Sequence, residues 1–158
     1  MNTQILQLAD SLLARDWRVV TAESCTGGGV AAQLTELAGS SAWLEGGFVT
    51  YSNAMKQRAL GISPALIEQH GAVSQQCVEA MATGALDNSL AQISVAISGI
   101  AGPGGGSEDK PVGTVWIAWA TVDPVIKSQC YKFNGARKAV RDQAVEQAIS
   151  GLLEMISG

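Results

Sequence analysis

The sequence has little histidine and no paired cysteines. Its one histidine is His70, and its three cysteines, Cys25, Cys77 and Cys130, lie far apart without a C-x-x-C motif. Zinc sites are built from clustered Cys and His side chains, so we expect no metal. The odd cysteine count fits reduced thiols, as in the cytoplasm. A serine–histidine triad would have to use His70.

The sequence also lacks a basic excess and long apolar runs. Ten Lys and Arg stand against 14 Asp and Glu, a formal net charge of -4. Binding nucleic acid through general phosphate attraction needs clustered cations, so we expect no nucleic-acid partner. No apolar run reaches the ~18 residues of a membrane span, and no N-terminal segment has the pattern of a secretory signal. We therefore expect a soluble cytoplasmic protein without a membrane partner.

What the sequence does contain is enough apolar material for a core. The chain has 158 residues, of which 47% are hydrophobic, and no repeat, linker or low-complexity segment divides it. This length falls within the size of one domain. We predict a single domain over residues 1–158.

Hydrophobic spacing predicts helices that alternate with strands. Early strands separated by helices, followed by a late hairpin, imply a three-layer α/β/α fold with a mixed, mostly parallel sheet. The apolar run 93–100 predicts a central strand buried on both faces. Asn53 is expected to cap a short helix that carries Lys56. The predicted strands are 17–22, 43–52, 93–100, 113–121 and 125–133, and the predicted long helices are 3–14, 74–86 and 136–156, with helical spacing also at 30–37.

One polar segment, Thr21–Gly29, lies between a predicted strand and a predicted helix. It reads Thr-Ala-Glu-Ser-Cys-Thr-Gly-Gly-Gly. Three successive glycines let backbone N–H groups and the helix N-terminus converge on one point, which suits an anion or a developing oxyanion. Ser24 and Cys25 are the candidate nucleophiles. The plainer alternatives are that Ser24 caps the helix and that the glycines let the helix pack closely on the sheet.

A second group is needed to activate either nucleophile. In open α/β sheets, ligands gather at the carboxyl ends of strands, where loops 23–29, 51–56 and 98–107 are expected to meet. The scarcity of histidine favours Lys56 as a base, although an exposed surface lysine is the plainer interpretation. Such a base requires a neutral amine near pH 7, with a pKa lowered from about 10.4 by burial or a nearby cation.

Known motifs leave a second hypothesis open. The G-x-S-x-G motif is absent around Ser24, and no glycine run is followed by the Gly-Lys-Ser/Thr of a P-loop. Residues 27–32 do satisfy G-x-G-x-x-A after a predicted strand, which indicates dinucleotide binding. However, Tyr51, Ser52 and Asn53 stand where an acidic residue would bind the ribose.

Five ordered motifs, taken together, resemble a known family. They are Ala22-Glu-Ser-Cys-Thr-Gly-Gly28, Val49-Thr-Tyr-Ser-Asn53 with Lys56, Ser98-Gly-Ile-Ala-Gly-Pro103, Lys110-Pro-Val-Gly-Thr-Val115 and Phe133-Asn-Gly-Ala-Arg137. This set resembles the nicotinamide-nucleotide amidohydrolase family, which is similar to the C-terminal domain of the CinA proteins. The resemblance runs from about residue 3 to residue 156.

The resemblance implies an activity and roles for named residues. The implied reaction is hydrolysis of the carboxamide of nicotinamide mononucleotide to nicotinate mononucleotide and ammonia, in pyridine-nucleotide salvage. Ser24 is then the nucleophile, Lys56 the general base and Tyr51 a proton relay or orienting hydroxyl, without metal or cofactor. A small-molecule substrate and a homodimer are also implied.

Residues of the same loops are expected to bind the substrate. Arg137, at a helix start, is the best phosphate ligand, with Arg141 one turn later as a second. Tyr51 or Trp43 would stack on the pyridine ring. The full predicted substrate-binding set is Thr26, Gly27, Gly28, Asn53, Gly99, Ala101, Gly102 and Arg137. Two alternatives remain: a non-hydrolytic NAD-binding domain, and an inactive regulatory module.

Overall fold

The computed structural model describes residues 2–157. Within them the strands form one five-stranded sheet in the order β2-β1-β3-β4-β5. The neighbours β2, β1 and β3 run parallel, whereas β3–β4 and β4–β5 pair antiparallel. The predicted mixed sheet and late hairpin are confirmed, but the sheet is not mostly parallel, because two of its strand pairs are parallel and two are antiparallel. The strands are β1 (Val19–Glu23), β2 (Leu44–Val49), β3 (Ile93–Gly99), β4 (Thr114–Thr121) and β5 (Ile126–Lys132).

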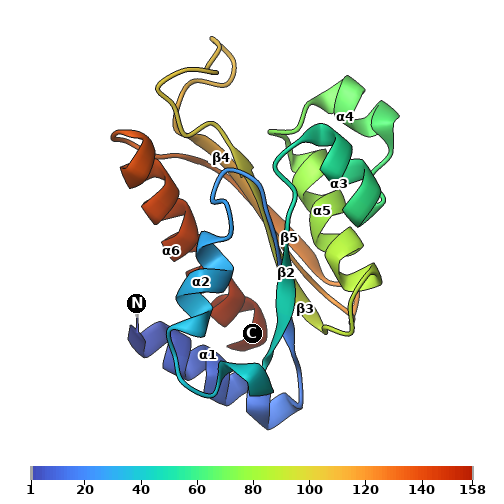
Figure 1. Ribbon diagram of the computed structural model, residues 1–158, viewed down its shortest axis with the longest axis vertical. Coiled ribbons are helices and arrows are strands. Elements are labelled where there is room, and N and C mark those ends of the chain that lie inside the picture. Colours follow the sequence, from blue (N-terminus) through green and yellow to red (C-terminus); the bar gives the residue numbers. More distant parts are fainter. Residues whose placement is uncertain (1, 158) are drawn as a thin grey trace.

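Helices cover both faces of this sheet (Figure 1). One face is covered by α1 (Asn2–Arg15), α2 (Gly29–Thr35) and α6 (Arg137–Ser157). The other is covered by α3 (Asn53–Leu60), α4 (Pro64–His70) and α5 (Gln75–Asp87). A short 3-10 turn, η1 (Ser40–Ala42), precedes β2. The predicted three-layer α/β/α architecture is therefore confirmed.

Strand β3 is the centre of the core. Every residue from Ile93 to Ser98 is buried, as predicted for a central strand. Ile93, Val95 and Ile97 belong to the cluster under α1, α2 and α6, whereas Ala96 belongs to the cluster under α5. Alternation along the strand thus supplies both faces, and each large aliphatic side chain contributes about 1.5–3 kcal/mol by burial.

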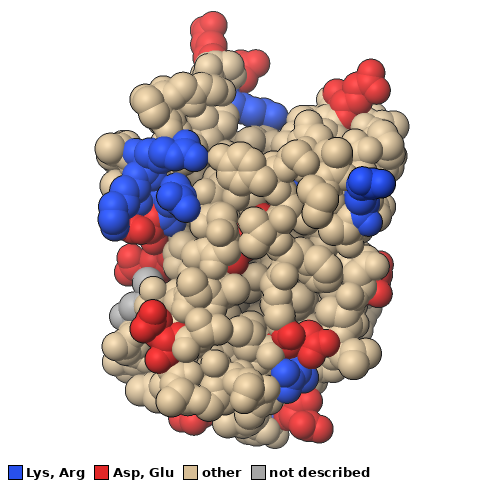
Figure 2. Space-filling view, viewed as in Figure 1, with Lys and Arg blue, Asp and Glu red and all other residues tan. Residues whose placement is uncertain are grey.

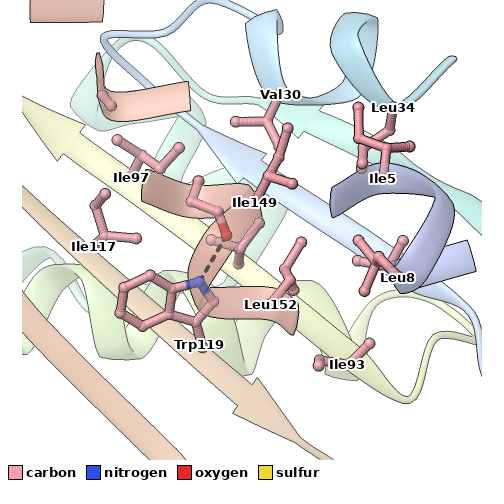
Figure 3. Packing of buried hydrophobic residues seen from close by; sticks show 14 of the residues in the cluster. Ile5, Leu8, Val30, Leu34, Ile93, Ile97, Ile117, Trp119, Ile149 and Leu152 are labelled. Atoms are coloured by element: carbon pink, nitrogen blue, oxygen red, sulfur yellow. Dashed lines mark hydrogen bonds between the residues drawn. The ribbon is translucent and has the colours of Figure 1, made fainter. Parts of the chain in front are cut away.

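Helix α6 lies directly on an indole ring of β4. Trp119 Nε1 donates a hydrogen bond to the carbonyl of Ala148 at 3.0 Å (Figure 3). A Cβ at Gly151 would lie 2.1 Å from the indole, so only glycine permits this approach. This contact helps to fix α6, whose first residue is Arg137, against the sheet.

The cap of α3 differs from the prediction. Ser52, not Asn53, is the N-cap: its hydroxyl accepts from the N–H of Met55 at 3.1 Å, and its backbone is extended (φ -85°, ψ 159°). Asn53 is the first helical residue. The prediction failed because Ser and Asn both cap well and stand side by side in the sequence.

None of the helices within residues 2–157 is both long enough and apolar enough to cross a membrane.

Candidate active site

A pocket of about 290 Å³ lies at the carboxyl ends of β1, β2 and β3. Residues that come after these strands meet there with the beginning of α6, as the topology predicts. Of the predicted site residues, Ser24, Tyr51, Asn53, Lys56, Gly99, Ala101, Gly102 and Arg137 line it, together with Cys25, Ser98 and residues of the α4–α5 and β3–β4 connections.

The structure brings Ser24 and Lys56 into hydrogen-bond contact. Lys56 Nζ lies 3.0 Å from Ser24 Oγ, although the two residues are 32 positions apart. The backbone N–H of Ser24 donates to Ile97 O at 3.0 Å, which ties the residue to the end of β3. Lys56 lies in the first turn of α3, and its backbone N–H donates to the carbonyl of the N-cap residue Ser52 at 3.1 Å, so the start of the helix fixes the position of its backbone.

The Lys56 amine has two further acceptors. It donates to the carbonyls of Thr50 at 2.9 Å and Tyr51 at 3.1 Å. The side chain is only 1% exposed and makes no ion pair with any carboxylate in the described part of the chain.

Burial has the largest influence on the pKa of this amine. It lowers the pKa of Lys56 from its ordinary value of 10.5, while the nearby thiols of Cys77 and Cys25 act to a smaller extent in the opposite direction. The amine therefore loses its proton more readily than an exposed lysine does.

Cys25 is a poor rival for Ser24. Burial raises the pKa of its thiol to about 11, so the thiol stays protonated at neutral pH. Its side chain also belongs to the apolar cluster under α6. The hydroxyl of Ser24, in contrast, contacts the amine directly.

Tyr51 contacts other site residues through both its backbone carbonyl and its phenolic oxygen. Its backbone carbonyl accepts from Lys56 Nζ, and from Ser24 Oγ at 3.4 Å. The side chain is 60% exposed, and the phenolic oxygen accepts from Arg137 Nη2 at 3.2 Å. Within residues 2–157 the phenol makes no hydrogen bond to Ser24 or Lys56, so its role as a proton relay stays a prediction.

Arg137 stands at the pocket mouth on the first residue of α6. Its Nη1 donates to Gly102 O at 2.9 Å, and its Nη2 holds Tyr51. Figure 2 shows Lys and Arg side chains gathered over the beginning of this helix, the segment that contains Arg137, Lys138 and Arg141. This is a suitable edge of the pocket for an anionic group.

The β3–β4 connection forms another wall of the pocket. Gly102 has a left-handed backbone (φ +85°), and a Cβ there would meet Val112 at 2.4 Å, which explains the glycine. Farther along, Lys110 Nζ donates to His70 O, the end of α4, at 3.2 Å. The contact of His70 with this connection is made by its backbone carbonyl and not by its imidazole. Within residues 2–157 no hydrogen bond joins His70 to Ser24.

The beginning of α2 is not available for a ligand. Glu23, absent from the predicted site, is 0% exposed, and its carboxylate accepts from the N–H groups of Val30 at 2.8 Å and Ala31 at 3.0 Å. The prediction that the start of this helix binds an anionic ligand is therefore wrong, because the carboxylate of Glu23 already accepts from its N–H groups, whereas stabilisation of an oxyanion by N–H groups of the preceding loop stays a prediction. The same contacts disfavour a pyrophosphate at this position, as dinucleotide binding would require.

Four residues that were expected to contact the substrate do not line the pocket. Thr26 is 2% exposed and donates its hydroxyl to Glu23 at 2.6 Å, and neither it nor Gly27 and Gly28 lines the pocket. Their role in substrate binding stays a prediction. Trp43 is 2% exposed within the core cluster, so the expectation that it stacks on a ligand ring is wrong.

Metal ligands are not clustered in the described part of the chain: residues 2–157 contain no group of three or more His, Cys, Asp or Glu side chains that would hold a metal ion.

Fold and site together define an α/β protein that holds a serine hydroxyl against a buried lysine amine, in a pocket at the carboxyl ends of its parallel strands. The CinA C-terminal domain family matches residues 2–156. The chain therefore belongs to the CinA C-terminal domain family.

Several relatives are similar over nearly their whole length. A Pseudomonas putida protein named nicotinamide-nucleotide amidohydrolase PncC is 52% identical over 155 residues, which cover 98% of this chain and 96% of that one. The Escherichia coli K12 protein of the same name is 53% identical over 157 residues, covering 96% and 94%. A solved structure of a CinA superfamily protein from Klebsiella pneumoniae has a TM-score of 0.93 at 42% identity and covers 98% and 96%.

Proposed function

We propose that this protein is a nicotinamide-nucleotide amidohydrolase. The substrate is nicotinamide mononucleotide, and the products are nicotinate mononucleotide and ammonia. The proposal is supported by the near-complete alignments with proteins of that name. The observation that carries it is the 3.0 Å contact between Lys56 Nζ and Ser24 Oγ inside the pocket.

The contacts of the amine suit a general base. A neutral amine has two N–H donors and one lone pair. With the two N–H groups directed at the carbonyls of Thr50 and Tyr51, the lone pair faces Ser24 Oγ. In our proposal Ser24 donates its proton to this lone pair, and the two carbonyls select the orientation in which it can.

The proposed chemistry proceeds in two stages. Ser24 Oγ attacks the carboxamide carbon while its proton passes to Lys56 Nζ, which forms a tetrahedral intermediate. Lys56 then returns the proton to the amide nitrogen, the C–N bond of the tetrahedral intermediate breaks, and ammonia leaves while an acyl-serine ester remains. Water attacks this ester with Lys56 again as base, releasing the carboxylate and restoring the serine hydroxyl.

Recognition of the nucleotide belongs to the other pocket residues. We propose that Arg137 binds the phosphate through charge-assisted hydrogen bonds, and that the exposed ring of Tyr51 lies beside the pyridinium ring. Asn53, Gly99, Ala101 and Gly102 would contact the carboxamide and ribose, because all four line the pocket. Backbone N–H groups of the two glycine-containing loops are candidates for the oxyanion hole.

The proposal includes a cellular location and an oligomeric state. A salvage reaction on an intracellular nucleotide places the protein in the cytoplasm. The family resemblance favours a homodimer, and Val49, Tyr51 and Met55, which are 49%, 60% and 44% exposed, offer apolar surface close to the pocket. Sedimentation of the purified protein would test the oligomeric state.

Mass spectrometry tests the central reaction. Purified protein is incubated with nicotinamide mononucleotide and a chelator, and nicotinate mononucleotide is followed together with ammonia. We expect product from the wild type and none above background from Ser24→Ala. Binding of the mononucleotide without turnover would favour an inactive module, and tight NAD binding without amide cleavage would favour the dinucleotide-binding hypothesis.

A further inference from the structure

A buried carboxylate forms hydrogen bonds with the loop that carries Ser24 and with the helix that follows it. Glu23, the last residue of β1, accepts four hydrogen bonds. Its Oε1 accepts from Thr26 Oγ1 at 2.6 Å and from the N–H of Val30 at 2.8 Å. Its Oε2 accepts from the N–H of Ala31 at 3.0 Å and from Thr21 Oγ1 at 3.2 Å. The carboxylate thus fastens the loop to both the strand before it and the helix after it.

This carboxylate has no cationic partner in the described part of the chain. Its charge is balanced by two hydroxyls and by the positive end of α2. A buried carboxylate is costly unless its oxygens are saturated, and here both oxygens accept two hydrogen bonds. Its position is therefore strongly determined, and so are the positions of the groups that donate to it.

Arg141, a residue of α6, forms hydrogen bonds with the same loop. Its Nε donates to Cys25 O at 3.0 Å, and its Nη2 lies 3.4 Å from Thr26 O. Glu23 thus accepts from the hydroxyl of loop residue Thr26 and from the helix that follows the loop, while Arg141 donates to two carbonyls of the loop. Arg141 does not line the pocket, unlike Arg137.

The loop needs such support because its last two residues are glycines. Gly27 and Gly28 both have left-handed backbones, with φ of +60° and +98°. Two adjacent glycines give an unbraced segment many alternative conformations. The directional contacts of Glu23 and Arg141 select one of them.

We infer that Glu23 and Arg141 are positioning residues that keep Ser24 Oγ within hydrogen-bond reach of Lys56 Nζ. Neither side chain touches the reacting atoms. Glu23 acts through the Thr26 hydroxyl and the first turn of α2, and Arg141 acts through the carbonyls of Cys25 and Thr26. The inference rests on the proposed function, because it takes Ser24 as the nucleophile. It also assigns Arg141 to the loop, leaving the phosphate to Arg137.

Two variants test the inference. Glu23→Gln keeps the size of the side chain but replaces one acceptor oxygen by an NH₂ group that faces N–H or O–H donors. Arg141→Gln removes the contacts to the two loop carbonyls. For each variant, kcat is measured with nicotinamide mononucleotide, and the Kd and binding stoichiometry of nicotinate mononucleotide are measured by calorimetry.

A positioning role lowers kcat without weakening binding. We expect kcat to fall on the order of 10- to 100-fold in both variants, because small displacements of a nucleophile are costly, with the product Kd within about 2-fold of the wild type. The stoichiometry separates this result from partial unfolding, which would reduce the number of binding sites and leave the turnover per site unchanged.

Glu45→Gln is the matched control. Glu45 is also a carboxylate that accepts from a side chain and a backbone N–H, namely Arg18 Nε and Leu90 N, both at 3.0 Å. It lies at the opposite end of the sheet, and we expect an unchanged kcat. If Glu23→Gln does not fold, Thr26→Val removes one of the four contacts and should lower kcat several-fold at unchanged Kd.

Two results would overturn the inference. One is an unchanged kcat per binding site in Glu23→Gln, or in Thr26→Val if it has to be used instead. The other is a weaker product Kd in Arg141→Gln at unchanged kcat, which would make Arg141 a phosphate ligand. Absence of turnover in the wild type would instead refute the proposed function itself.

Discussion

The two walls of the pocket are held in different ways. The wall after β1 consists of Ser24 and Cys25, which belong to the five-residue loop 24–28 that both Glu23 and Arg141 contact. The wall after β3 is the longer connection 100–113, which is rich in glycine. Its side-chain links to other parts of the chain include Arg137 to Gly102 O and Lys110 to His70 O.

This difference matches the task of each wall. Attack by a hydroxyl requires atoms held to within a fraction of an ångström, which a short braced loop at a strand end provides. Enclosing a nucleotide requires adjustment, which a glycine-rich connection with few tethers provides. We therefore expect substitutions in the first wall to change kcat and those in the second to change KM.

The largest effect is expected from the pair that performs the chemistry. Ser24→Ala removes the nucleophile and Lys56→Met removes the base, so each should lower kcat on the order of 10³-fold or more. Steady-state ammonia release measures this loss. Since the two groups act as a unit, the double variant should be about as impaired as either single one. Multiplied losses would mean that the two act independently.

Arg137→Gln comes next and should act on binding. It removes a charge-assisted contact, so KM for nicotinamide mononucleotide should rise on the order of 10- to 100-fold, with a smaller change in kcat. Nicotinamide riboside, which lacks the phosphate, is the matched probe. If the variant impairs both substrates equally, Arg137 does not bind the phosphate.

Lys110→Met should loosen the second wall. It removes the hydrogen bond to His70 O and leaves the strands and Ser24 untouched. We expect KM to rise about 2- to 10-fold at nearly constant kcat, as for the loss of one hydrogen bond. Lys127→Met, at an exposed position of β5 outside the pocket, serves as control. A fall in kcat alone would show that the two walls are not functionally separate.

Cys25→Ala should have the smallest effect. With the pKa of its thiol raised to about 11, Cys25 contributes almost no thiolate at neutral pH. We expect kcat within about 3-fold of the wild type, together with a loss of roughly 1 kcal/mol in the free energy of unfolding from the small cavity. Loss of activity comparable to that of Ser24→Ala would instead point to the thiol.

The braced wall also shows how far the sequence predicts this molecule. Regular spacing located the strands and helices, and the run 93–100 correctly indicated the central strand. The meeting of Ser24 with Lys56 agrees with the rule that strand ends converge. The roles of Glu23 and Arg141 could not be predicted in this way, because each depends on contacts made only after folding: Arg141 reaches a loop 115 residues away.

Two wrong predictions about the site, the anion site at the start of α2 and the stacking role of Trp43, also have physical causes. A helix start preceded by glycines looks like an anion site, unless a nearby carboxylate occupies it, as Glu23 does here. A tryptophan before a strand can face a ligand or the core, and the spacing around Trp43 does not distinguish the two. The acidic residue inside the Glu-Ser-Cys-Thr motif was the available signal for these contacts, since a carboxylate at the end of a buried strand must find hydrogen-bond donors.

The most direct test is to titrate Lys56 and the reaction together. NMR of the lysine side chains, assigned with Lys56→Met, gives the pKa of this amine, and kcat is followed over the same pH range. Because burial lowers the pKa of Lys56, we expect it to titrate below 10.5 and kcat to rise with pH through that same value. A Lys56 that titrates at or above 10.5, or a kcat that falls as the amine loses its proton, would contradict its role as the base that activates Ser24.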